Sequence, residues 1–441
     1  MKRTLILWLV PAVVLVAIIV GVVAGPRLAE LVTGTAPAAE RLRAAASLRT
    51  PGPADQSVSE LEGLVEGGDD NPTALAQLGA AYLQLARETG DPGYYARAES
   101  VLGRALELDP DSLDALIGVG SLALSRHEFD EAISFGERAL ALSGPVARVY
   151  GVIGDAQIEL GRYDEAVATI QAMVDLRPDL ASLSRVSYLR ELHGDLPGAI
   201  DAMERALSAG GPNAENTEFV RVQLGNLHFA AGDLEEAERL YQQALVQLPD
   251  YVYALGGLAR VRAAQGTFDE SIDLFRSATD RLPIPELVIG LGETLEAAGR
   301  QAEADDQYAL VGAIQRLYAA NGVRTDLELA AFFADHGDPQ EALELARAAH
   351  DAEPNTRAAD ALAWALYRSG DAAAAWAFVE EALRLGTVDA RIRYHAGMIA
   401  MALDRDDQAR EHLTTALERN DRFSPLDARQ AEEALAELGS G

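Results

Sequence analysis

Three similar stretches of this sequence read DEAISFGERAL at residues 130–140, DEAVATIQAMV at 164–174 and EEAERLYQQAL at 235–245. Each opens with acidic residues and an alanine, and apolar residues then recur at helical spacing. Aligning the alanines extends the pattern to ten positions, 33, 34 or 38 residues apart, which we call the markers: Ala98, Ala132, Ala166, Ala199, Ala237, Ser271, Ala304, Ala342, Ala375 and Ala409. A period near 34 residues indicates a repeat protein, in which each unit buries its apolar face against the next.

Other positions keep the same period. A small residue precedes each marker by twelve positions, except that an insertion shifts the first to Gly79: Gly120, Gly154, Ser187, Gly225, Ala259, Gly292, Ala330, Ala363 and Gly397. Five positions before the marker, seven units have the glycine that a left-handed helix end requires: Gly161, Gly194, Gly232, Gly266, Gly299, Gly337 and Gly370. Proline closes the second helix of five units, after which the next unit begins. The sequence therefore predicts an all-α chain of helical hairpins.

The segments ALIGVGSLALSRHEFDEAISFGERALAL at 115–142 and VYGVIGDAQIELGRYDEAVATIQAMVDLRP at 149–178 resemble the tetratricopeptide repeat family. The resemblance implies a right-handed α-solenoid of about ten repeats over residues 71–421, followed by a capping helix and tail at 422–441. Members of this family bind unrelated partners, so the fold leaves the partner open. The resemblance implies a protein or peptide partner, held in the concave groove that the first helices line.

The resemblance also implies which side chains point into that groove, and the seven aromatic ones fall in two patches. The first patch, in units four to six, consists of Tyr188, Phe219, Phe229 and Tyr253 with Glu191, Asn226 and Arg260. The second patch, in units nine and ten, consists of Trp364, Tyr367, Tyr394, Met398 and Met401 with Arg357, Arg368 and Arg391. We expect Trp364 and Tyr394 on one concave surface, rimmed by the three arginines. In the alternative interpretation, these side chains pack between neighbouring first helices.

An uncharged apolar stretch covers residues 4–25, directly after Lys2 and Arg3. As a helix it would be about 33 Å long, enough to cross a hydrocarbon core of about 30 Å. We expect residues 1–26 to form a signal anchor or transmembrane segment, with the N-terminus in the cytoplasm and the repeats outside it. The alternative is a secreted protein, cut from its signal peptide near Ala24. Residues 27–70 have a linker composition, with short helices expected at 38–48 and 57–65.

Composition argues against several classes of function. The formal net charge is −32 and Lys2 is the only lysine, so this surface would repel nucleic acid. Cysteine is absent, which excludes disulfides, thiolate nucleophiles and thiolate metal sites. The seven histidines have no metal-ligand spacing, and no phosphate-binding loop has its lysine. We therefore expect no enzymatic activity, cofactor, metal or small-molecule substrate.

The sequence thus favours a non-enzymatic scaffold that is tethered to a membrane and binds a partner outside the cytoplasm. An envelope or cytochrome-type assembly factor, acting as a chaperone-like adaptor, is one alternative. A purely structural spacer is the other, and burial of both aromatic patches would favour it.

Overall fold

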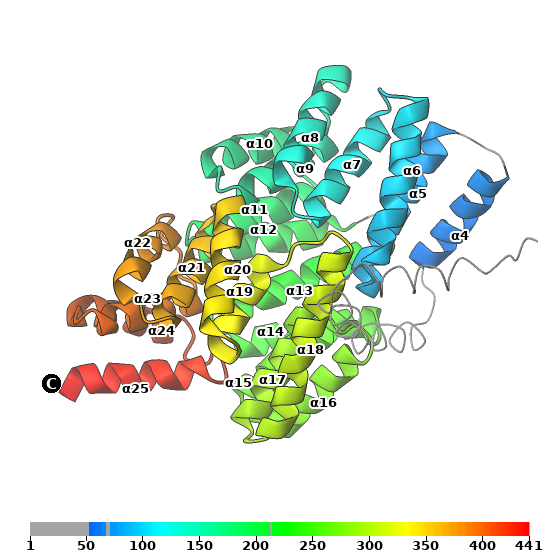
Figure 1. Ribbon diagram of the computed structural model, residues 1–441. Coiled ribbons are helices and arrows are strands. Elements are labelled where there is room, and N and C mark those ends of the chain that lie inside the picture. Colours follow the sequence, from blue (N-terminus) through cyan, green and yellow to red (C-terminus); the bar gives the residue numbers. More distant parts are fainter. Residues whose placement is uncertain (1–52, 68–70, 212–213, 441) are drawn as a thin grey trace, which may run out of the picture.

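The computed structural model describes residues 53–67, 71–211 and 214–440, and within these ranges every regular element is a helix. The helices α5 to α24 pair into ten consecutive hairpins, which are units one to ten (Figure 1). One helix, α4 (Pro53–Glu66), precedes the hairpins, and α25 (Asp427–Ser440) follows them. The predicted all-α solenoid of helical hairpins is confirmed for this part of the chain.

Each unit has a first helix, a hairpin turn, a second helix and a repeat turn that leads to the next unit. The first helices are α5 (Pro72–Thr89), α7 (Leu113–Ser125), α9 (Ala147–Glu159), α11 (Leu180–Leu192), α13 (Ala214–Ala230), α15 (Val252–Ala264), α17 (Pro285–Ala297), α19 (Asp326–His336), α21 (Thr356–Arg368) and α23 (Ala390–Ala402). The second helices are α6 (Gly93–Leu108), α8 (Phe129–Ser143), α10 (Tyr163–Leu176), α12 (Leu196–Ala209), α14 (Leu234–Gln247), α16 (Phe268–Thr279), α18 (Gln301–Ala320), α20 (Pro339–Ala352), α22 (Ala372–Ala382) and α24 (Asp406–Arg419).

The predicted anchor at 1–26 and the short helix expected at 38–48 lie outside the described residues. None of the helices that the structure describes combines the length and the apolar composition needed to cross a membrane.

Backbone geometry explains where the helices end. Six of the seven predicted stop glycines have φ between 67° and 93°, the left-handed region that glycine enters without strain. Gly337 is the exception, because its φ is −126°. Aspartates begin many of the following helices: the Asp195 and Asp371 carboxylates, for example, accept a hydrogen bond from a backbone N–H of the first turn.

The small residues of the repeat lie where first and second helices meet. All ten marker side chains have no exposed surface. The residue four positions after a marker fills the space beside the small residue of the first helix: a Cβ added at Gly225 would lie 2.6 Å from the Tyr241 ring, and one at Gly397 would lie 2.6 Å from Leu413. Both contacts are too close for a larger residue, so small residues there permit the close helix packing. The register predicted from the markers is confirmed.

The solenoid coils so tightly that its second half lies on its first half. The hairpin turns of units one to five contact the repeat turns that follow units six to ten, and we call this contact the seam. The Asn420 side-chain amide donates to the Phe229 carbonyl, 191 residues away, at 2.7 Å. The Tyr163 hydroxyl lies 3.2 Å from the Thr356 hydroxyl, 193 residues away. These separations correspond to about five to six repeats of 34 residues, which make one superhelical turn. In Figure 1 the yellow helix α19 accordingly appears next to α11 and α13, and residues of all three helices line one cavity.

Backbone atoms of the two superhelical turns approach each other closely across the seam. A Cβ added at Gly161 would collide with the carbonyl oxygen of Pro354, and one at Gly194 would collide with that of Gly386. Glycine is therefore needed at these two turns for close approach as well as for positive φ.

Candidate binding site

The two superhelical turns enclose a cavity of about 860 Å³, which we call the central cavity. Its walls come from first helices α11, α13, α15 and α17 and from turns near α23 and α25; its charged lining residues are His127, Glu191, Arg260, Glu286, Glu293, Arg324, Arg357, Asp389, Arg391 and Arg422. Two smaller cavities, of about 400 and 460 Å³, are also lined by Glu191. Glu191 therefore lies where the three spaces meet.

The lining of the central cavity differs in charge from the chain as a whole. Five arginines face four carboxylates there, whereas acidic residues outnumber basic ones 69 to 37 in the full sequence. Burial raises the pKa of Glu191 to about 7, with Asp389 adding to the rise and Arg357 opposing it. Burial also raises the pKa of Glu293 to about 7, although Arg391 opposes the rise. The arginines and these two raised pKa values make the lining of the cavity more positive than the chain as a whole.

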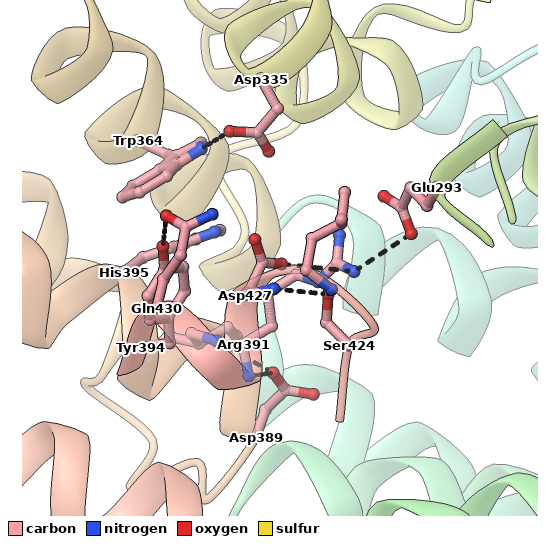
Figure 2. Close-up of polar contacts among 12 residues, drawn as sticks. Glu293, Asp335, Trp364, Asp389, Arg391, Tyr394, His395, Ser424, Asp427 and Gln430 are labelled. Atoms are coloured by element: carbon pink, nitrogen blue, oxygen red, sulfur yellow. Dashed lines mark hydrogen bonds and ion pairs between the residues drawn. The ribbon is translucent and has the colours of Figure 1, made fainter. Parts of the chain in front are cut away.

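Arg391 links three helices at the wall of this cavity (Figure 2). Its guanidinium lies 3.9 Å from the Glu293 carboxylate of α17 and 3.8 Å from the Asp427 carboxylate of α25. Its backbone N–H donates to the Asp389 carboxylate, which begins α23, at 2.9 Å. Burial alone would lower the pKa of Arg391, but Glu293 and Asp427 outweigh burial and raise it. Arg391 therefore stays charged and holds units seven and ten of the second superhelical turn and the C-terminal helix together.

The first predicted patch faces the cavities for the most part. Tyr188, Glu191, Asn226, Phe229 and Arg260 line at least one of the three, and Phe219 lines the one of about 460 Å³. The Arg260 guanidinium donates to the Asn226 amide oxygen at 2.6 Å, which fixes both side chains on the wall.

Tyr253 instead contacts unit one. Its hydroxyl donates to the carbonyl of Arg87 at 3.3 Å, and its ring packs edge-on against Phe219.

The second predicted patch is divided by the structure. Arg357 and Arg391 line the cavities, but Trp364 and Tyr394 are 2% and 1% exposed, so the expectation that they share an open concave surface is wrong. The Trp364 indole N–H donates to the Asp335 carboxylate at 2.9 Å, and its ring stacks on His395 at 4.1 Å. The Tyr394 hydroxyl donates to Gln430 of α25 at 3.0 Å.

The remaining members of the second patch surround this core. Tyr367, Met398 and Met401 are half-buried and pack against it. Arg368 is exposed, covers the Trp364 ring and forms a 2.8 Å ion pair with Asp335. These side chains therefore pack between neighbouring first helices, as the alternative interpretation predicted.

Sequence reasoning missed the cavity residues that come from repeat turns. Asp389 and Arg422 line the central cavity, and neither lies on the groove face of a first helix. Their position depends on where the second superhelical turn lies on the first, which no local pattern encodes. In the part of the chain that the structure describes, no group of three or more His, Asp or Glu side chains is placed to hold a metal ion.

Comparison with known proteins agrees with this architecture. Family models described as tetratricopeptide repeat match residues 83–147 and 222–284, 123–191 and 390–422. With the ten hairpins, these matches identify the chain as a tetratricopeptide repeat protein.

Individual relatives are distant. Cellulose synthase operon protein C of Xanthomonas axonopodis pv. citri is 29% identical over 254 residues, which is 54% of this chain and 15% of that protein. Anaphase-promoting complex subunit 7 of Arabidopsis thaliana is 22% identical over 41% of this chain and 32% of its own length. The chain therefore spans a third or less of the length of these two curated relatives. A solved tetratricopeptide repeat protein from Parabacteroides merdae is 17% identical and covers 59% of this chain and 99% of its own, with a TM-score of 0.36.

Proposed function

We propose that this protein is a non-enzymatic interaction scaffold that binds a polypeptide segment in the central cavity. The observation that carries the proposal is the cavity itself, whose volume of about 860 Å³ is bounded by polar and apolar side chains from many units. Tetratricopeptide repeats support binding of a protein or peptide partner, and first helices supply most of the wall.

The chemistry of the wall favours a segment with carboxylates and apolar side chains. Arg260 and Arg357 offer guanidinium groups that can pair with carboxylates, and Tyr188 and Phe229 offer apolar surface beside them. The long-range field of a chain with net charge −32 opposes an acidic partner, so local contacts must supply the affinity. Such a complex should therefore form slowly at low salt and faster at higher salt.

We further propose that residues 1–26 hold the scaffold in a membrane with its repeats outside the cytoplasm. The support is the uncharged stretch 4–25 after Lys2 and Arg3. The expected result is that the protein stays in the membrane fraction after carbonate washing, and that protease added from outside digests residues 71–441. A mature N-terminus at Gly25 would instead show cleavage and secretion.

Site-specific photo-crosslinking tests the cavity. A photoreactive side chain at Ala230, which lines the central cavity, should capture a partner in native membranes, and the same side chain at exposed Ala168 of α10 should not. Arg260→Glu should weaken that capture at least tenfold, whereas Arg205→Glu on the exposed face of α12 should leave it unchanged. Equal capture from both positions would place the site elsewhere. Capture from neither would favour the structural spacer.

A further inference from the structure

The seam is an intramolecular contact between two kinds of edge. One kind is formed by hairpin turns and the other by repeat turns. Gly90 of unit one contacts Leu282 after unit six, Gly161 of unit three contacts Pro354 after unit eight, and Phe229 of unit five contacts Asn420 after unit ten. Units one to five therefore contribute their hairpin turns, and units six to ten contribute their repeat turns.

Each superhelical turn consequently has a second edge that the described chain does not cover. Edge one consists of the repeat turns after units one to three, and edge two consists of the hairpin turns of units six to ten. Among the described residues nothing covers edge two: a Cβ added at Gly266, Gly299 or Gly370 meets none of their atoms within 4 Å, although these glycines occupy the same repeat position as Gly161 and Gly194. Edge two is therefore formed by hairpin turns, as is the side of the seam that units one to five provide.

Edge one has the apolar side chains of an interface. Six large apolar side chains are exposed in the described part of the chain, and three of them end second helices at this edge: Leu108, Leu142 and Leu176. All three are 47–48% exposed and lie ten residues after their markers. Exposed leucines at three successive repeats form a stripe rather than scattered single residues.

The seam shows what a leucine at this position does when the edge is covered. Leu385 lies ten residues after the marker Ala375 of unit nine, and it packs across the seam against a cluster that includes Tyr163 and Ile170. On edge two the residue equivalent to Tyr163 is Phe268 of unit six, and it is half-buried whereas Tyr163 is buried. Edge one therefore has leucines at the position of Leu385, and edge two has one aromatic residue, Phe268, at the position of Tyr163.

We infer that edge one of one copy of this chain stacks on edge two of a second copy and continues the superhelix head to tail. The contact repeats the seam: repeat turns of units one to three in one molecule lie on hairpin turns of units six to ten in the other. Because the two surfaces differ, the contact is heterologous and leaves an open edge at each end, so it generates chains rather than closed dimers.

Charge sets the conditions under which these chains form. Each copy has a formal net charge of −32, so two copies repel each other at long range. Added salt screens this repulsion over about 8–10 Å at physiological strength, while the apolar contact at the edges is retained. We therefore expect self-association to strengthen as salt concentration rises, the reverse of an interface held by opposite charges.

Sedimentation velocity of the full chain in detergent, over a range of protein and salt concentrations, tests the inference. The mean mass should grow beyond a dimer with protein concentration and should grow further at high salt. Leu142→Asp with Leu176→Asp blocks edge one, and Gly299→Asn with Gly370→Asn blocks edge two with a residue that tolerates left-handed backbone. Each blocked variant alone should associate at least tenfold more weakly. A mixture of the two should form a one-to-one dimer and stop there, because each retains the edge that the other lacks.

Several outcomes would overturn the inference. A chain that is monomeric at every concentration and salt strength has no such contact. A mass that stops at a dimer, or a mixture that fails to associate, indicates a different interface. Circular dichroism of both variants, helical at the temperature of the sedimentation experiment, shows that loss of association is not loss of fold.

Discussion

The stop glycines provide matched substitutions for the seam. Gly161 and Gly299 occupy the same position of units three and seven, and their φ values are 67° and 74°. Alanine at either position adds the same methyl group to a left-handed backbone. At Gly161 that methyl collides with the carbonyl oxygen of Pro354, whereas at Gly299 it meets nothing within 4 Å.

The expected losses follow from these contacts. Left-handed strain costs about 1–2 kcal/mol for a residue with a Cβ, and both variants incur it. The collision at Gly161 adds about 1–3 kcal/mol, because one turn must shift away from the other as in an overpacked core. Gly161→Ala should therefore lower the free energy of unfolding by about 2–5 kcal/mol, and Gly299→Ala by about 1–2 kcal/mol.

Urea unfolding followed by circular dichroism measures both losses on one scale. Gly194→Ala and Gly266→Ala form a second pair, since only Gly194 contacts a backbone across the seam. Equal losses of unfolding free energy within each pair would mean that the hairpin turns do not touch the following superhelical turn in solution. That result would contradict the seam.

Three further predictions concern the core, the register and the pH dependence of folding. Trp364→Ala should cost about 3–5 kcal/mol of stability in urea unfolding, because the ring is buried and Asp335 loses one of its donors; unchanged stability would mean that Trp364 is not buried in the folded chain. Ala237→Arg should cost about 3–5 kcal/mol because the marker is fully buried, while exposed Glu235→Arg should stay within about 0.5 kcal/mol, and equal thermal melts would mean that the register is wrong. The pKa of Glu191 is raised to about 7 in the folded chain, so the stability that this carboxyl gives below its unfolded pKa of about 4.5 is lost as pH rises through 7. Glu191→Gln should therefore stabilise the protein by about 1–3 kcal/mol more at pH 8 than at pH 5, and a variant that follows the parent chain at both pH values would contradict the raised pKa.

The local architecture was predictable from sequence because the same pattern of residues recurs in ten units. Each marker, each small residue before it and nearly every stop glycine occupies the predicted position, and agreement among units removes the ambiguity of a single helix. Gly337 departs from the pattern, yet α19 and α20 still form a hairpin.

The seam and the fate of the second aromatic patch were not predictable in the same way. Assigning a residue to the groove face requires only the helix period, but its exposure depends on the superhelical pitch, which sums small rotations over many units. Trp364 and Tyr394 have the spacing of groove residues, yet Asp335, His395 and Gln430 cover them from α19, α23 and α25. Glu191 lies on the groove face as expected, but the raised pKa depends on burial and on Asp389 of a distant unit.

The stacking of two superhelical turns around the central cavity is tested most directly by a crosslink across the seam. The chain has no cysteine of its own, so a thiol crosslinker reacts only with the two cysteines that are introduced. Arg162 and Arg384 are exposed side chains on opposite sides of the seam, and the Arg384 guanidinium lies 5.3 Å from the ring of Tyr163, the residue next to Arg162. We expect Arg162→Cys with Arg384→Cys to be joined within one molecule by a short bismaleimide. The control pair, Arg300→Cys with Arg384→Cys, uses the equivalent position on edge two and should stay unjoined. No crosslink in the first pair, or equal crosslinking in both, would contradict the closed superhelix and the cavity that it encloses.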